Sequence, residues 1–220
     1  MPELPEVETT KRGISPHIKN QKVREVILRR KTLRWPIPPA LSKDLPGQRI
    51  DSVSRRGKYL LLSTSKGTLL IHLGMSGSLR LVKQSQSIGK HDHVDIVFEN
   101  KQILRYTDPR RFGCMLWHTT DIALHPLLVT LGPEPLDDCF DAKYLHGKSR
   151  GKTAPVKTFI MDSKIVVGVG NIYANESLFM AGINPKRNAG KISLPRYVKL
   201  VECIKLVLQK AIDVGGTTLR

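Results

Sequence analysis

The sequence is poor in cysteine, in aromatic residues and in acids, and it contains no long apolar run. Cysteine occurs only three times among 220 residues, at Cys114, Cys139 and Cys203. An odd and widely spaced set argues against a disulfide framework. The chain also has no Cys-x-x-Cys and no His/Cys cluster with the spacing of a metal site. We therefore expect no metal site in this sequence and interpret the three cysteines as structural thiols.

Long hydrophobic segments are also lacking. No apolar run reaches the roughly 18 residues that a membrane-spanning helix needs. The early acids differ from the basic start of a secretory signal peptide. These absences exclude a membrane partner from our expectations and favour the cytoplasm as the compartment.

The scarcity of acids leaves a large positive charge. The chain has 36 Lys and Arg residues against 19 Asp and Glu residues, which gives a formal net charge of +17. An excess of this size is greater than solubility requires and indicates a polyanionic partner. Because no segment suits a membrane, a nucleic acid is the favoured partner.

The hydrophobic pattern divides the chain near residue 130. Up to about residue 117, short segments predict β-strands, including a strand over residues 93–98. Residues 60–62 and 69–71 predict a hairpin around the turn Ser65-Lys66-Gly67. Before these strands, residues 5–13 predict a short helix that ends ahead of Ser15-Pro16.

Helices are predicted beyond residue 130. One covers residues 172–181, and a last one begins at an N-cap Ser193 and ends at Gly215-Gly216. The last helix has one apolar stripe formed by Tyr197, Leu200, Val201, Ile204, Leu208 and Ile212. The sequence therefore predicts an α+β protein with a β domain over residues 1–130 and a helical domain over residues 131–220.

The first eight residues, Met1-Pro-Glu-Leu-Pro-Glu-Val-Glu8, allow two interpretations. Removal of Met1 would leave Pro2 with a free secondary amine beside Glu3. A free α-amine has a pKa near 8, so part of it is neutral at pH 7 and can form a Schiff base with a carbonyl. Glu3 could then move protons at the same centre. Alternatively, the segment only opens a helix, because proline and acids both suit a first turn.

Two loop segments suggest contact with nucleic acid. Gly168-Val-Gly-Asn171 precedes a predicted helix, whose unpaired N–H groups could bind phosphate; the alternative is a tight turn with Asn171 as N-cap. Asp108-Pro-Arg-Arg-Phe-Gly113 places arginines and an aromatic ring between strands. Such side chains can read a base edge or wedge into a base step, although an ordinary strand connection with an Asp–Arg pair has the same pattern. Met75, flanked by glycines, is a core residue or a protruding wedge.

Two further basic clusters have equally open interpretations. Arg55-Arg-Gly-Lys58 enters a strand and is a solvated face, a phosphate clamp or a source of a proton-shuttling lysine. In Lys90-His-Asp-His93, the two histidines could ligate a metal from one strand face, but no third ligand is apparent. We therefore expect His91 and His93 to be solvated or to face phosphate.

Taken together, these motifs resemble the formamidopyrimidine-DNA glycosylase family, bacterial enzymes that excise 8-oxoguanine and ring-opened purines. The resemblance extends over essentially the whole chain. It rests on the N-terminal octapeptide, Arg56-Gly-Lys-Tyr-Leu-Leu-Leu62, His72-Leu-Gly-Met-Ser-Gly77, Lys90-His-Asp-His93, Asp108-Pro-Arg-Arg-Phe-Gly113 and Val166-Val-Gly-Val-Gly-Asn-Ile-Tyr-Ala174.

The resemblance implies a fold and a set of catalytic roles. The expected fold is an N-terminal helix and a two-sheet β-sandwich, followed by a helix–two-turn–helix domain, with damaged double-stranded DNA as the partner. Pro2 would be the nucleophile, Glu3 the acid/base, and Lys58 an aid to elimination. The expected activity is excision of oxidised purines together with abasic-site lyase activity, in a monomer acting on the bacterial nucleoid.

The same resemblance implies contacts with DNA. Met75, Arg110 and Phe112 would fill the gap left by an extruded base, with the arginine facing the orphaned cytosine. Phosphate contacts are expected from His72, His91, Lys152, Lys157 and Asn171.

The sequence departs from the family pattern at its ends. Family members end in a four-cysteine zinc ribbon, so one structural zinc ion is expected in a full-length protein but no cofactor in this chain, which we expect to be a truncated form. If Met1 is retained, the Pro2 nitrogen is an amide and cannot attack.

Two alternatives to a purine-specific glycosylase remain open: a non-catalytic fragment that binds distorted DNA, or the oxidised-pyrimidine branch of the family. That branch opens Pro-Glu-Gly-Pro and lacks this Met/Arg/Phe set, so the sequence favours the purine branch.

Overall fold

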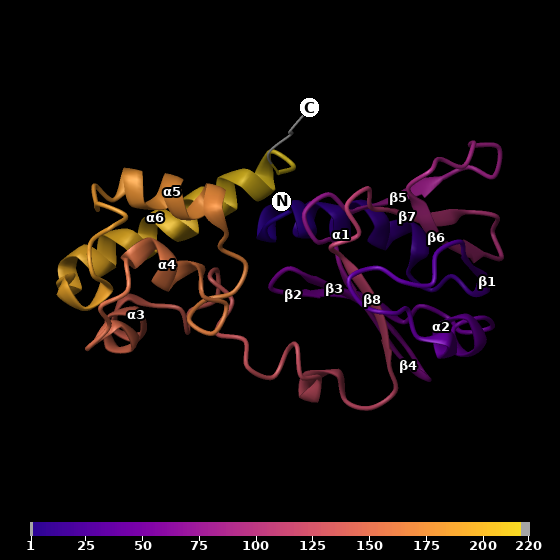
Figure 1. Cartoon of the computed structure of the whole chain (residues 1–220), viewed down its shortest axis with the longest axis horizontal. Helices are drawn as coiled ribbons and strands as arrows, with labels where there is room; N and C mark the ends of the chain where they lie inside the picture. The colour runs from indigo at the N-terminus through magenta and orange to yellow at the C-terminus, as the bar shows by residue number, and fades with distance from the viewer. Residues whose placement is uncertain (1, 217–220) are drawn as a thin grey trace. The chain divides into compact units, whose positions relative to one another are not determined.

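The computed structural model describes residues 2–216, which form two compact units. One unit contains Pro2 and Val7–His125, and the other contains Glu3–Glu6 and residues 126–216. The strands lie in the first unit, and the helices that follow residue 126 lie in the second (Figure 1). The family resemblance correctly implied an N-terminal helix, two β-sheets and a following helical region.

The strands of the first unit form two antiparallel sheets in the described part of the chain. One sheet has the order β1-β6-β7-β5 and the other β2-β3-β4-β8. The strands are β1 (Val23–Leu28), β2 (Ser52–Arg56), β3 (Tyr59–Thr64), β4 (Gly67–His72), β5 (Ser78–Val82), β6 (Asp92–Phe98), β7 (Ile103–Thr107) and β8 (Cys114–His118). A short helix, α2 (Pro39–Asp44), follows β1 in the chain, and a 3₁₀ turn (Ile122–Leu124) follows β8.

The core of the first unit contains residues from both sheets. The predicted hairpin is confirmed, with Leu61 paired to Leu70 and Leu62 to Leu69 across β3 and β4. Leu62 and Leu69 are fully buried in the same hydrophobic cluster as Ile96 of β6. Burying one such side chain contributes about 1.5–3 kcal/mol, so the cluster is the main source of stability for this unit.

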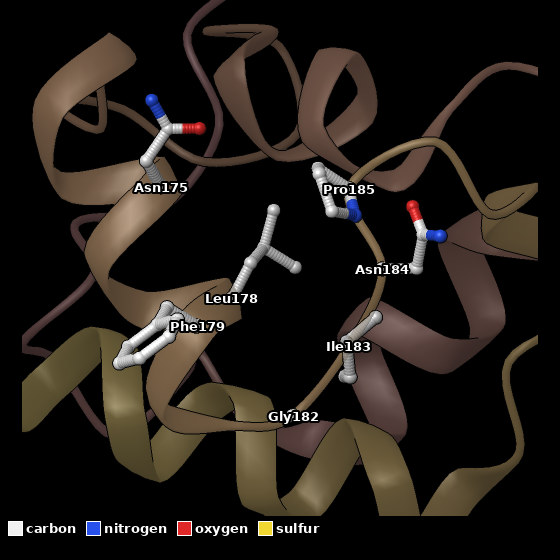
Figure 2. Close-up of a pocket in the computed structure, with 7 residues that line it drawn as sticks. All are labelled: Asn175, Leu178, Phe179, Gly182, Ile183, Asn184 and Pro185. Carbon is white, nitrogen blue, oxygen red and sulfur yellow. The ribbon is translucent and has the colours of Figure 1, made fainter.

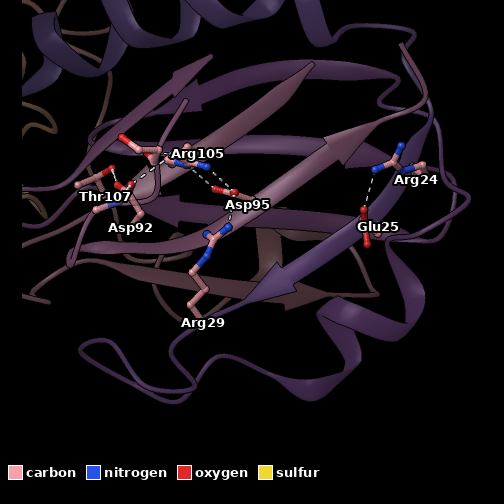
Figure 3. A network of polar contacts seen from close by, with 9 residues as sticks. Arg24, Glu25, Arg29, Asp92, Asp95, Arg105 and Thr107 are labelled. Atoms are coloured by element: carbon pink, nitrogen blue, oxygen red, sulfur yellow. Dashed lines mark hydrogen bonds and ion pairs between the residues drawn. The ribbon is translucent and has the colours of Figure 1, made fainter. Parts of the chain in front are cut away.

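Strand β6 is buried along its whole length, including its polar residues. The Asp95 carboxylate accepts hydrogen bonds from Arg105 Nε and Nη2, both at 2.9 Å, and from Arg29 Nη2 at 2.6 Å (Figure 3). Asp92 accepts a bond from the Thr107 hydroxyl at 2.5 Å. Buried charges require such partners, and strand β7 and the residue that follows β1 supply them here.

The N-terminal helix α1 (Leu4–Ile18) is longer than expected. The prediction that it ends before Ser15-Pro16 was wrong, because Pro16 lies inside it. Proline lacks an N–H and disfavours a helix interior. Here Ile14 and Ile18 are buried in the core on either side of the proline, and this packing holds the last turn in helical form.

The second unit contains helices α3 (Ala142–Ser149), α4 (Val156–Met161), α5 (Asn171–Met180) and α6 (Leu194–Asp213), with a 3₁₀ turn at Ala189–Lys191. The prediction for α6 is confirmed. Its apolar stripe is buried, and Ser193 is the N-cap residue, although its side chain makes no capping bond. None of the described helices combines the length and hydrophobicity needed to cross a membrane.

Glu8 on α1 is the centre of an ion-pair cluster within the first unit. Its carboxylate lies 3.0 Å from Arg55 Nε, 2.9 Å from Lys11 Nζ and 2.9 Å from Arg12 Nε. Burial alone would raise the pKa of Glu8, but the hydrogen bonds from these cations lower the pKa to about 2. The cluster therefore attaches α1 to strand β2.

Glu8→Gln should lower the free energy of unfolding at pH 7 by about 2 kcal/mol. The pKa of Glu8 is lower in the folded state than its usual value of 4.5. Its contribution is therefore complete above pH 4.5 and is lost as the pH falls towards 2. Urea titrations between pH 2 and pH 7 measure this loss.

The matched control is Glu25→Gln, because the Arg24–Glu25 pair, drawn in Figure 3, has side chains that are about half exposed. Exposed pairs contribute about 0–1 kcal/mol, so this variant should stay close to wild type. An unchanged acid dependence in Glu8→Gln would contradict the assignment.

Candidate functional site

The Glu3 carboxylate binds the N-terminus of helix α5, within the second unit. Glu3 is 1 % exposed. It accepts hydrogen bonds from the backbone N–H groups of Gly170 at 2.7 Å, Ile172 at 2.9 Å and Tyr173 at 3.4 Å. A carboxylate at this position also interacts favourably with the positive end of the helix dipole. The first residues of the chain are thereby fixed to residues about 167 positions later.

The glycines before α5 permit this close approach. The N–H of Leu4 donates to the Gly168 carbonyl at 3.1 Å, and Gly168 has a φ of +82°, which disfavours residues with a side chain. A Cβ atom at Gly170 would collide with the Glu3 carboxylate. The Gly-Val-Gly sequence is therefore required by its contact with Glu3 and Leu4.

This geometry corrects the interpretation of the turn before α5. The N-cap residue is Gly170 rather than Asn171. Backbone N–H groups that we expected to bind phosphate are bound to Glu3 instead. The Asn171 side chain is exposed at the same helix end.

Glu6 is a second acid in this cluster, and the sequence interpretation missed its role. Its carboxylate accepts a bond from the Glu3 backbone N–H at 2.8 Å and another from the Tyr173 hydroxyl at 2.6 Å. The Glu3-x-x-Glu6 spacing is that of a capping box, in which the third helical residue binds the N-cap N–H. That spacing was the available signal. Pro2, which is half-buried, directly precedes this cap; Met1 lies outside the described residues.

The expected wedge residues lie on two loops of the first unit. Met75 lies in the turn after β4, and Phe112 lies in the connection between β7 and β8. Both are unusually exposed for large apolar side chains, at 42 % and 45 %. The Arg110 guanidinium lies 4.7 Å from the centre of the Phe112 ring. Exposed apolar side chains of this kind are typical of a binding surface.

Met75 and Phe112 line a common cavity of about 480 Å³. Gly74, His72 and Arg34 complete its lining. No sequence pattern indicated a role for Arg34. Its backbone N–H donates a hydrogen bond to the Gly113 carbonyl at 3.1 Å. The cavity therefore brings three of the expected DNA-binding residues, His72, Met75 and Phe112, to one surface.

His72 is held in one tautomer at this cavity. Its Nδ1 accepts a hydrogen bond from the Gly74 N–H at 3.0 Å, so a neutral ring carries its proton on Nε2. Burial, with the nearby positive charges of Lys58 and Arg34, lowers the pKa of His72 to about 4. The ring is therefore neutral at pH 7 and can donate one hydrogen bond. Lys58 lies in the turn between β2 and β3.

The two histidines of Lys90-His-Asp-His93 have different environments. The expectation that His93 is solvated or faces phosphate was wrong, because it is 4 % exposed and its Nε2 lies 2.8 Å from the Asp108 carbonyl oxygen. His93 lies in strand β6 and contacts the loop that follows β7, so it is not a surface group. His91 is half-buried, and its carbonyl accepts the Asp108 N–H at 3.0 Å.

The remaining expected residues belong to the second unit. Lys157 is half-buried in the first turn of α4, and Lys152 is exposed in the preceding loop. Lys152 lines a cavity of about 460 Å³, whereas Lys157 and Asn171 are not among its lining residues.

Another cavity, of about 520 Å³, lies between the end of α5 and the following loop (Figure 2). Leu178 and Ile183 contribute apolar walls, and Phe179 is 88 % exposed beside it. None of the residues expected at the site lines this cavity.

The three cysteines are free thiols. Cys114 and Cys203 are buried free thiols, which fits a structural role, whereas Cys139 is exposed. Within residues 2–216, no group of three or more His, Cys, Asp or Glu residues could hold a metal ion.

The fold and these motifs define a class of protein. The model of the formamidopyrimidine-DNA glycosylase N-terminal domain matches residues 1–115, and the model of the formamidopyrimidine-DNA glycosylase H2TH domain matches residues 131–220. The chain belongs to the formamidopyrimidine-DNA glycosylase family.

Individual relatives agree with this assignment. The formamidopyrimidine-DNA glycosylases of Stenotrophomonas maltophilia strain R551-3 and Cellvibrio japonicus are 60 % and 62 % identical, over all of this chain and 81 % of theirs. A Lactococcus lactis Fpg in complex with Fapy-dG-containing DNA matches 99 % of this chain and 82 % of its own, with a TM-score of 0.92 and 34 % identity. Its complex with abasic-site DNA gives 0.92 and 36 %, over 99 % of this chain and 81 % of its own.

Gly170→Ala should destabilise the protein by more than about 2 kcal/mol, because the added methyl group overlaps the buried Glu3 carboxylate. Thermal unfolding measures the effect. Gly147→Ala is the matched control: it lies in helix α3 with open space around its Cβ position, so it should be neutral or stabilising by up to about 1 kcal/mol. Equal melting temperatures for the two variants would contradict the described contact.

Proposed function

We propose that this chain is a base-excision-repair DNA glycosylase and abasic-site lyase that removes oxidised purines through a Schiff base on Pro2. The observation that carries the proposal is the fixed position of Glu3. Three backbone N–H groups hold its carboxylate, and the preceding residue is the expected nucleophile. Precise positioning of reacting groups supplies a large part of enzymatic rate enhancement.

The proposed chemistry uses the amine of Pro2, the carboxylate of Glu3 and the side-chain amine of Lys58. The neutral amine of Pro2 attacks C1′ of the damaged nucleotide and displaces the base. Cleavage of the C1′–O4′ bond, with a proton delivered to O4′, then opens the sugar ring and forms the iminium. Glu3 transfers protons at this centre. Lys58 assists the following elimination, which breaks the sugar–phosphate backbone. The reaction requires the free Pro2 nitrogen and hence removal of Met1.

The proposed partner is damaged double-stranded DNA. The solved relatives include complexes with Fapy-dG and abasic-site DNA, and the +17 charge of this chain suits a polyanion. The proposed phosphate contacts are His72, His91, Lys152, Lys157 and Asn171. His72 would contribute as a neutral N–H donor.

Extrusion of the damaged base costs a few kcal/mol, and we assign its compensation to the exposed loops. Met75 and Phe112 would fill the vacated space and the adjacent base step. Arg110, stacked on Phe112, would bond the orphaned cytosine. No step proposed here depends on the zinc ion that the family resemblance implies for a full-length protein. We further propose that the protein acts as a monomer in the bacterial cytoplasm, on nucleoid DNA.

Borohydride reduction should trap a covalent complex between this chain and abasic-site DNA, because it reduces the Schiff base. Pro2→Gly should weaken trapping by exchanging the secondary amine for a primary one, and a retained Met1 should abolish trapping.

Glu3→Gln should lower the rate of base excision by about 10²-fold or more, because proton transfer at the reacting centre is lost. Lys66→Gln, an exposed control in the β3–β4 turn, should trap normally. Trapping in protein with a verified Met1 would indicate a lysine nucleophile and refute the Pro2 assignment.

DNA affinity should fall steeply with salt, because bound lysines and arginines release counterions from phosphate. Lys157→Gln should reduce the slope of log affinity against log salt by about one and weaken binding to all sequences alike. Lys43→Gln, an exposed lysine on α2, serves as the control for total charge. Fluorescence anisotropy between 50 and 300 mM salt, roughly the range over which such effects are large, measures both. An affinity independent of salt would exclude a phosphate-dominated interface.

A further inference from the structure

Asp108 is a buried carboxylate at the start of the loop that carries Arg110 and Phe112, and its side chain contacts both exposed loops of the first unit. Its exposed fraction is 0 %. The carboxylate accepts hydrogen bonds from the Ser76 hydroxyl at 2.7 Å, the Gly113 N–H at 2.9 Å and the Tyr106 hydroxyl at 3.2 Å. Ser76 and Gly113 belong to the two loops that carry Met75 and Phe112, whereas Tyr106 lies in strand β7.

Ser76 extends this connection to Arg110. While its hydroxyl donates to Asp108, its oxygen accepts the Arg110 backbone N–H at 3.2 Å. Ser76 directly follows Met75 in the chain. One hydrogen-bonded path therefore runs from the loop of Met75 to the backbone of Arg110.

The two loops are also in direct backbone contact. Gly74 has a φ of +64°, and a Cβ atom there would collide with the Phe112–Gly113 peptide. A Cβ atom at Gly113 would collide with the Tyr106 hydroxyl. Neither loop can therefore move far without displacing the other.

The main chain of Asp108 fixes the same loop to the sheet. Its N–H donates to the His91 carbonyl at 3.0 Å, and its carbonyl oxygen lies 2.8 Å from His93 Nε2. The buried position of His93 thereby has an explanation. Asp108 connects the loops to the start of β6 through its backbone and to each other through its side chain.

We infer that Asp108 and Ser76 are positioning residues that hold Met75, Arg110 and Phe112 as one preorganised unit, and that discrimination of the base opposite the lesion depends on them. This inference rests on the proposed function, since it concerns the residues assigned to base extrusion. Asp108 is fully buried and acts only through these neighbours. A preformed arrangement avoids the ordering cost that mobile loops would incur on binding.

Substitutions at the two positions should therefore lower the ratio of excision rates for lesions opposite C and opposite A. Ser76→Ala removes the acceptor of the Arg110 N–H and one donor to Asp108. Asp108→Asn replaces one acceptor oxygen by an NH₂ group that faces existing donors. Each should lower the ratio by about fivefold, the order expected for one lost hydrogen bond. Ser76→Thr keeps the hydroxyl, so its ratio should stay within about twofold of the wild-type ratio.

Asp95→Asn is the matched control. Asp95 is an equally buried carboxylate, 1 % exposed, in the same unit, and its partners are Arg29 and Arg105 rather than the loops. It should lower the melting temperature while leaving the ratio unchanged. An unchanged ratio in both Ser76→Ala and Asp108→Asn would overturn the inference. An equal loss in Asp95→Asn would also overturn it, since general destabilisation would then explain the effect.

Amide hydrogen exchange tests the same coupling without relying on activity. Ser76→Ala should accelerate exchange at Arg110 and Gly113, which lie on the other loop. Unchanged exchange there would overturn the inference. If the wild-type chain neither excises nor traps, the proposed function fails, and the exchange measurement alone decides whether the loops are coupled.

Discussion

The binding of the Glu3 carboxylate to the N-terminus of α5 is the constraint on which the candidate catalytic site depends. A buried charge is tolerated only when it is fully paired, and here the partners are backbone N–H groups fixed by a helix. Hydrogen bonds to charged groups contribute about 1.5–3 kcal/mol each. Because Pro2 is covalently attached to Glu3, the same bonds restrict the position of the Pro2 nitrogen. Glu6 and the glycines at 168 and 170 are needed for this geometry.

Asp108 has the corresponding role in the β unit. Like Glu3, it is a buried carboxylate that accepts a backbone N–H, here from Gly113, where a glycine allows close approach. We assign to Glu3 the positioning of the proposed catalytic groups, and to Asp108 the positioning of the exposed side chains proposed for base extrusion. Glu3 is held by the N-terminus of a helix, and Asp108 is held in part by Tyr106 and His93 of neighbouring strands.

Local patterns in the sequence predicted the elements whose residues contact one another within a short stretch. Helix α6 and the β3–β4 hairpin followed from apolar periodicity and turn residues. The extension of α1 past Pro16 could not be predicted this way, because it depends on packing of Ile14 and Ile18 in the core. The N–H groups before α5 were assigned to phosphate because their partner, Glu3, lies far away in the chain. The burial of His93 likewise depends on a bond to the next loop.

The most direct test of the account is to locate the covalent bond in the borohydride-trapped complex by tryptic digestion and tandem mass spectrometry. The account predicts that the reduced sugar remnant is attached to the Pro2 nitrogen, in the peptide that ends at Lys11. The same peptide contains Glu3, so its fragment ions also exclude attachment elsewhere in the segment. A remnant on a lysine side chain, such as Lys58, would contradict the central claim that the position fixed by Glu3 is the catalytic one.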